Sequence, residues 1–122
     1  MIQVFGTKKC ADTRKAERFF RERGVPLQAI DLATKGPSPG ELRSIAQAVG
    51  GVWKLLDKDG KRARAKGLAH ALLGDPDIER ALLADPRLLR TPVVRSGKAA
   101  TVGPATADVV AIWTTWVVTE RT

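Results

Sequence analysis

The first 24 residues constrain the fold of the chain most strongly, because a strand pattern there passes directly into a helix pattern. Residues 2–5 alternate as a short buried strand does, and Gly6 breaks that alternation. From Asp12 onward the apolar residues recur at helical spacing, with Asp12 or Thr13 as the expected helix cap. Gly24 is placed to end the helix. The segment up to Gly24 therefore predicts a β-strand, a turn and an α-helix.

The one cysteine of the chain, Cys10, lies on the turn between this strand and this helix. The N–H groups of a first helical turn point toward such a position, and the positive end of the helix dipole stabilises a thiolate there. Lys8, Lys9 and Arg14 add cationic side chains nearby in the sequence. Such surroundings lower the pKa of a cysteine from about 8.5. A small, buried and inert cysteine is the alternative, and the position favours the reactive thiolate.

The rest of the chain predicts further strands and helices. Strands are expected at 27–32, 92–94 and 99–102, and helices at 38–49, 67–73, 75–84 and 106–117. Ser38 and Glu41 have the spacing of a capping box, and Asp75 is the expected cap of its helix. Trp53 is expected either in the core, which is the more common outcome for tryptophan, or at the rim of a site. Residues 54–66 are expected to form a solvated loop.

In this order the elements predict one α/β domain spanning residues 1–122. A right-handed βαβ unit comes first, and its second strand is parallel to its first. A helical insertion follows, and a C-terminal ββα unit then adds two antiparallel strands, completing a mixed four-stranded sheet.

The net charge of +8 raises the question of an anionic partner. Cations are concentrated in residues 54–66, where only Asp57 and Asp59 oppose them. The chain contains no nucleic-acid-binding motif and no Tyr, so we expect this segment to steer small anions toward a site rather than to bind nucleic acid. One cysteine predicts neither a disulfide framework nor a metal site, and His70 is given no role. No signal peptide or membrane-spanning run is recognised, so a cytoplasmic setting is expected.

Three blocks of the sequence resemble the arsenate reductase-like (ArsC/Spx/YffB) family, a branch of the thioredoxin-like fold. The first is Cys10 followed, after three residues, by Arg14 and Lys-Ala, within CADTRKAERFFRERGVPLQAIDL. The second is DPRLLRTPVV at 85–94, which resembles the family's stretch through its cis-proline. The third is TVGPATADVV at 101–110, which resembles its last strand and closing helix. The resemblance implies a thioredoxin-like fold and a cis peptide bond before Pro92.

The resemblance also implies thiol chemistry, with Cys10 as nucleophile and Arg14 stabilising the thiolate or an anionic substrate. The residue before the cis-proline offers its backbone to an extended thiol substrate in such folds. The residues then expected to bind the substrate or thiol are Lys8, Lys9, Thr13, Arg90, Thr91 and Pro92.

A single cysteine constrains the reaction itself. Thr13 stands where a C-x-x-C protein has its second cysteine, so no intramolecular disulfide can form. Turnover must pass through a mixed disulfide with a small thiol such as glutathione or mycothiol, or with an external protein thiol. We therefore expect a glutaredoxin-like, single-cysteine, thiol-dependent reductase with no tightly bound cofactor. An oxyanion or a protein disulfide is the expected class of substrate.

Arsenate is expected to be a poor substrate. Arsenate reductases of this family carry three further arginines, and the aligned positions here are Asp57, Thr91 and Gly103. Neighbouring cations do not reproduce a planar arginine clamp. The alternative function is an Spx-like regulator or adaptor without catalysis. In that case the basic face and the last helix, which carries Trp113 and Trp116, would hold a protein partner or a second copy of the chain.

Overall fold

The computed structural model describes residues 1–121. It begins with the expected βαβ unit of β1 (Ile2–Gly6), α1 (Ala11–Glu22) and β2 (Leu27–Asp31). β1 and β2 are parallel, with Gly6 opposite Asp31 at the end of the pair. Gly6 thus belongs to β1 rather than breaking it, because its backbone continues the ladder although it has no side chain to extend the alternation.

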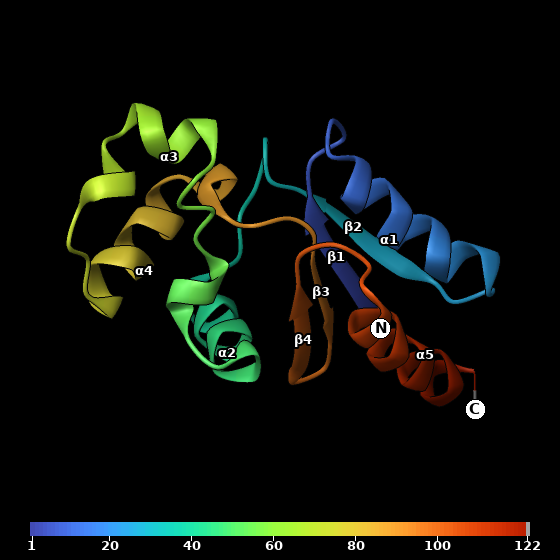
Figure 1. The fold of residues 1–122 in the computed structure, drawn as a ribbon. Helices are drawn as coiled ribbons and strands as arrows, with labels where there is room; N and C mark the ends of the chain where they lie inside the picture. The colour runs from blue at the N-terminus through green and yellow to red at the C-terminus, as the bar shows by residue number, and fades with distance from the viewer. Residues whose placement is uncertain (122) are drawn as a thin grey trace.

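The C-terminal unit completes a four-stranded sheet in the order β2-β1-β3-β4 (Figure 1). β3 (Val93–Ser96) is antiparallel to β1, and β4 (Ala99–Val102) is antiparallel to β3. The last helix, α5 (Ala107–Glu120), begins at Thr106, whose hydroxyl accepts the N–H of Val109 at 3.3 Å. The predicted mixed sheet, in a thioredoxin-like α/β arrangement, is confirmed.

The insertion between β2 and β3 is helical, as expected. Its elements are α2 (Pro39–Val49), the 3-10 helix η1 (Val52–Leu55), α3 (Lys61–Ala65), the 3-10 helix η2 (Leu68–His70), α4 (Asp75–Ala84) and the 3-10 helix η3 (Pro86–Leu88). The capping box of α2 is confirmed, because the Ser38 hydroxyl accepts the Glu41 N–H and the Glu41 carboxylate accepts the Ser38 N–H. In α4 the cap lies one residue earlier than expected, at Gly74, whose N–H donates to the Asp77 carboxylate.

Two segments of the insertion differ from the secondary structure expected for them. Residues 54–66 are not entirely loop, because α3 forms there, held by the buried Ala63 and by an ion pair between Arg62 and Asp85 at 3.0 Å. Residues 67–73 form only η2 rather than a helix. Leu72, which would have belonged to the apolar face of that helix, is fully exposed, so no buried face stabilises so short a segment. The side chain of His70 lies outside the described residues, so the expectation that it has no role stays a prediction.

One face of the sheet packs against α1 and α5 (Figure 1). Ile2, Val4 and Val94 lie on this face and contact the buried Trp113 cluster. The indole N–H of Trp113 donates to the Thr101 hydroxyl at 2.8 Å. Trp116 is also buried, so both tryptophans of α5 belong to the core.

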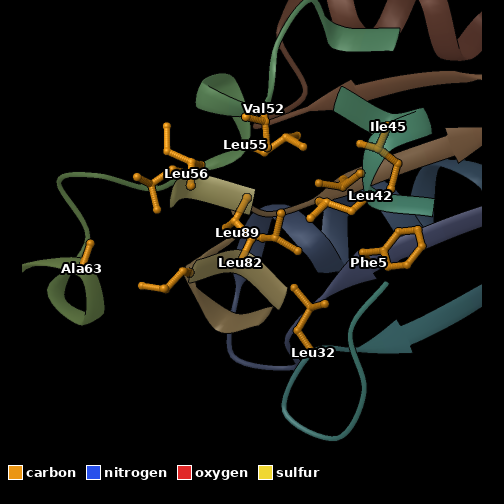
Figure 2. Packing of buried hydrophobic residues seen from close by; sticks show 13 residues of the cluster. Phe5, Leu32, Leu42, Ile45, Val52, Leu55, Leu56, Ala63, Leu82 and Leu89 are labelled. Carbon is orange, nitrogen blue, oxygen red and sulfur yellow. The ribbon is translucent and has the colours of Figure 1, made fainter. Parts of the chain in front are cut away.

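The opposite face packs against the insertion, and Figure 2 shows the side chains of this second cluster. Its members come from β1, β3 and the helices of the insertion, and include Phe5, Leu32, Leu42, Ile45, Leu55, Leu82, Leu89 and Val93. Trp53 is 59% exposed, so its expected place in the core is wrong. In a 3-10 helix residues three apart share a face, and in η1 Val52 and Leu55 take the buried one.

Among the described residues, none of the helices combines the length and the apolar character needed to cross a membrane.

Candidate active site

Cys10 is the N-cap residue of α1, with φ −81° and ψ 115°. Its N–H donates to the Thr7 carbonyl at 3.1 Å, and its own carbonyl accepts the Arg14 N–H at 3.2 Å. The expected cap at Asp12 or Thr13 is therefore wrong. The tight turn after β1 starts the helix early and leaves these two residues at N2 and N3, where the free N–H groups lie. Gly24 ends the helix in the left-handed conformation, as predicted.

Thr91 reaches Cys10 from the far end of the sequence. Its hydroxyl donates to the Cys10 Sγ at 3.2 Å. The Thr91–Pro92 peptide bond is cis, as the family resemblance implies. The segment before β3 thus lies directly beside the cysteine, and the structure brings together two parts of the site that the sequence separates widely.

Thr13 lies beneath the sulfur and is 3% exposed. Its hydroxyl has no hydrogen-bond partner of good geometry in the described part of the chain. The sulfur of Cys10 is the acceptor within its reach, and a bond from this hydroxyl stabilises the thiolate. The Cys10 side chain makes no capping hydrogen bond of standard geometry to the helix. A thiolate would therefore give the buried hydroxyl the acceptor that it otherwise lacks.

The pKa of the Cys10 thiol lies below its ordinary value. Burial of the sulfur opposes ionisation and raises the pKa, and hydrogen bonds outweigh it. The donors are the hydroxyls of Thr13 and Thr91 and the backbone N–H groups of Thr13 and Asp12. The lowered pKa agrees with the prediction. Its cause differs in part, because the hydroxyls of Thr13 and Thr91 provide stabilisation of the thiolate that the prediction assigned to neighbouring cations.

Of the cations near Cys10, Arg14 contacts the turn that leads into the cysteine, whereas Lys8 and Lys9 line a cavity beside it. The Arg14 guanidinium donates to the Lys8 carbonyl at 2.6 Å and so fixes the backbone that leads into Cys10. Lys8 and Lys9 are exposed, and both line a cavity of about 680 Å³. Within residues 1–121 the Arg14 guanidinium bonds to the Lys8 carbonyl and makes no hydrogen bond to the Cys10 sulfur, so Arg14 positions the turn.

Two hydrogen bonds to the end of η1 and the residue after it fix the orientation of Arg90. Its backbone N–H donates to the Leu55 carbonyl at 2.7 Å, and its Nε donates to the Leu56 carbonyl at 3.2 Å. Leu56 also pairs with Leu89 in an isolated antiparallel bridge. These contacts tie η1 to the chain just before Thr91 and give Arg90 a defined direction.

Two of the positions where arsenate reductases carry arginine adjoin this segment closely. Thr91 bonds to Cys10, and Gly103 donates its N–H to the Pro92 carbonyl at 3.0 Å. The third, Asp57, donates its N–H to the Leu88 carbonyl at 2.9 Å. None of the three supplies a guanidinium. Within the described residues, no group of three His, Cys, Asp or Glu side chains is arranged to hold a metal ion.

Gly6 is a site residue that the sequence pattern missed. A Cβ built on Gly6 would lie 2.3 Å from the Thr13 hydroxyl oxygen, far inside any allowed contact. Glycine at this position therefore lets Thr13 pack against β1 under the cysteine. The signal was present, since a glycine ended the strand pattern just before the reactive turn, but no rule of periodicity linked it to Thr13.

The geometry can be set beside known proteins. A model of the ArsC family matches residues 5–112. The Bacillus subtilis (strain 168) protein YusI is 28% identical over 98 residues, covering 78% of this chain and 83% of YusI. A structure named as the YffB protein superposes with a TM-score of 0.78 at 24% identity, covering 92% of this chain and 97% of that one. A structure named as arsenate reductase from Vibrio cholerae gives 0.79 at 22% identity, covering 91% and 96%. These two structural likenesses show the fold.

Proposed function

Because the chain belongs to the ArsC family, we propose that it is a thiol-dependent reductase that works through Cys10 alone. The observation that carries the proposal is the half-buried sulfur at the start of α1, with the Thr91 hydroxyl 3.2 Å away and the free N–H groups of Asp12 and Thr13 stabilising its anion. Such an arrangement favours the nucleophilic thiolate over the neutral thiol.

The reaction takes place in two exchanges. The Cys10 thiolate attacks the glutathione sulfur of a mixed disulfide, a new S–S bond forms on Cys10, and the substrate leaves as a thiolate that takes a proton from water. A second glutathione, as its thiolate, then attacks the glutathione sulfur on Cys10. Glutathione disulfide forms, and the Cys10 thiolate departs unchanged. The substrate thiol is released in reduced form, and one reduced glutathione is consumed as it joins the first in glutathione disulfide.

The residues around Cys10 have separate roles in this cycle. The hydroxyls of Thr13 and Thr91 stabilise the sulfur as nucleophile in the first exchange and as leaving group in the second. The backbone at Thr91 and Pro92 is the edge on which an extended thiol substrate docks. Arg14 positions the turn through the Lys8 carbonyl. A cycle that consumes a reduced small thiol fits a cytoplasmic setting.

Arsenate is a weak substrate in this proposal. Three guanidinium groups that would each make charge-assisted bonds to an oxyanion are replaced by Asp57, Thr91 and Gly103. Loss of such bonds removes stabilisation where negative charge develops in the transition state. Reduction of small disulfides, which needs only the thiolate and a docking edge, does not depend on them.

The regulator or adaptor alternative has less to support it. Trp113 and Trp116 lie in the core and are not presented to a partner. The large apolar side chains that α5 leaves exposed are Ile112 at 44% and Val118 at 65%, as far as the described residues show. We therefore rank catalysis first.

The test is turnover of a mixed disulfide between glutathione and a small thiol, with reduced glutathione as donor and the formation of glutathione disulfide as readout. The native protein should accelerate the exchange, and Cys10→Ser should not. Circular dichroism of both proteins checks that the serine variant is folded. A native protein no faster than Cys10→Ser would overturn the proposal.

A further inference from the structure

A basic cavity of about 680 Å³ lies beside the turn that carries Cys10. One wall is the Thr7–Lys9 turn after β1, and another is formed by α3 and the η3 region of the insertion, all on the upper side of the view in Figure 1. The charged side chains that line it are Lys8, Lys9, Lys61, Arg62, Arg87 and Asp31. Five cations and one carboxylate give this cavity a strong excess of positive charge.

Most of these cations are not neutralised by the protein. In the part of the chain that the structure describes, no carboxylate lies within ion-pair distance of Lys8, Lys9, Lys61 or Arg87. The opposing carboxylate, Asp31, accepts the Ala33 N–H at 2.9 Å within its own turn. Four unpaired cations facing one cavity repel each other, and an anionic ligand would remove that repulsion.

The cavity wall is held in place by Asp85. Its carboxylate pairs with Arg62 at 3.0 Å and with Lys66 at 3.5 Å, and it accepts the Arg87 backbone N–H at 3.3 Å. This one side chain joins α3 to η3. The side chains of Lys61 and Arg87 therefore extend from a fixed frame, which lowers the entropic cost of ordering them on a ligand.

The size and position of the cavity indicate its ligand. A volume of about 680 Å³ is that of a small-molecule site. Its Lys9 wall is joined directly to Cys10, and consecutive Cα atoms are about 3.8 Å apart. The cavity therefore adjoins the turn from which a small molecule joined to the Cys10 sulfur would extend.

We propose that this cavity binds the carboxylates of the small thiol that reacts at Cys10, an inference that rests on the proposed function. Glutathione carries two carboxylates, whereas mycothiol is a sugar-linked thiol with none. The cavity thus selects a carboxylate-bearing thiol over an uncharged one. In the exchange with glutathione disulfide, the Cys10 thiolate forms a new S–S bond with one glutathione sulfur, and the other glutathione leaves as a thiolate and is protonated by water.

The test compares two disulfides in that single exchange. One is glutathione disulfide, and the other is the same molecule with its carboxylates blocked as ethyl esters. Formation of the Cys10 adduct is followed by intact-protein mass spectrometry, which counts one adduct on one cysteine. Because the ester also changes the intrinsic reactivity of the disulfide, the quantity compared between variants is the ratio of the two rate constants.

Lys61→Ala with Arg87→Ala removes two exposed cations of the cavity while leaving the Asp85–Arg62 pair intact. We expect this double variant to react roughly three- to tenfold more slowly with glutathione disulfide, with the ester rate unchanged. Lys98→Ala is the matched control, because Lys98 is exposed in the hairpin between β3 and β4, at the opposite end of the sheet from Cys10. It should leave both rates and their ratio as in the native protein.

The outcomes separate the two proposals. If the double variant keeps the native ratio while both disulfides still react, the cavity does not recognise carboxylates and this inference is overturned. If neither disulfide modifies the folded native protein, the proposed function itself has failed. Single variants Lys61→Ala and Arg87→Ala, checked by circular dichroism, provide the same comparison should the double variant not fold.

Discussion

Gly6 and Thr13 are packed so closely that residue 6 has no room for a side chain. A Cβ there would lie 2.3 Å from the Thr13 hydroxyl oxygen and 2.4 Å from its methyl carbon. Because a hydrogen bond from the Thr13 hydroxyl stabilises the Cys10 thiolate, the last residue of β1 determines how closely Thr13 can pack beneath the sulfur. The site is thus shaped by a residue that never touches the reacting atom.

Gly6→Ala should damage both the fold and the site. Either Thr13 or β1 must shift, which costs about 1–3 kcal/mol in the free energy of unfolding. Alkylation of Cys10 should slow as the Thr13 hydroxyl moves from the sulfur. Denaturant unfolding and the alkylation rate measure the two effects. Gly40→Ala is the control, since a Cβ at Gly40 meets nothing within 4 Å and its stability should not fall.

Thr91→Val should raise the pKa of Cys10. The hydroxyl that donates to the sulfur at 3.2 Å is lost, and the valine keeps the volume. The pH dependence of Cys10 alkylation reports the change. Thr119→Val, on the exposed part of α5, should leave the pKa unaltered. An unchanged pKa in Thr91→Val would show that this hydrogen bond does not stabilise the thiolate.

Thr13→Val should also raise the pKa of Cys10, but with a distinctive effect on stability. The Thr13 hydroxyl is buried and has no hydrogen-bond partner of good geometry among the described residues, and a neutral thiol is a weak acceptor. At a pH where the thiol is protonated, valine should therefore be neutral or stabilising. At a pH where the thiolate forms, the same variant should lose stability relative to the native protein. Chemical unfolding at the two pH values tests this reversal.

The lowered pKa of Cys10 predicts how stability depends on pH. Below the folded-state pKa both states hold the proton, and ionisation contributes nothing. As pH rises from that value to about 8.5, where the unfolded thiol ionises, the unfolded state binds more protons and the free energy of unfolding increases. Above that range the contribution is constant. The difference between native protein and Cys10→Ser should show this rise, and a flat difference would contradict it.

Thr101→Val should destabilise the cluster between the sheet and α5. The indole N–H of Trp113 donates to Thr101 at 2.8 Å and would be left buried without an acceptor. The expected loss is about 1–3 kcal/mol in the free energy of unfolding. Thr114→Val is the control on the exposed side of α5, and its effect should stay within about 0.5 kcal/mol.

The sequence predicted the strands, their directions and most helix positions, because these follow from local periodicity and from Gly and Ser signals such as Gly24 and Ser38. It failed where local rules compete. Capping preferences favour Asp12 or Thr13, yet the turn after β1 makes Cys10 the cap. Trp53 has the largest apolar side chain of its segment, yet the three-residue period of η1 places it on the exposed face.

The sequence indicated only part of the site. Cys10 was singled out by the turn pattern, and the Thr91–Pro92 segment by the family resemblance. The basic cavity was not, because Lys8 and Lys9 precede α1 whereas Lys61, Arg62 and Arg87 belong to the insertion, and no pattern within either segment says that they meet. The role of Gly6 was missed for the same reason, since its meaning depends on what packs against it.

The central claim is that Cys10 is held as a reactive thiolate, and its pKa in the folded protein tests this most directly. With one cysteine in the chain, the pH dependence of alkylation by iodoacetamide reports a single group. We expect the apparent pKa to lie clearly below that of a free cysteine derivative measured under the same conditions. A value equal to or above that of the free thiol would contradict the account.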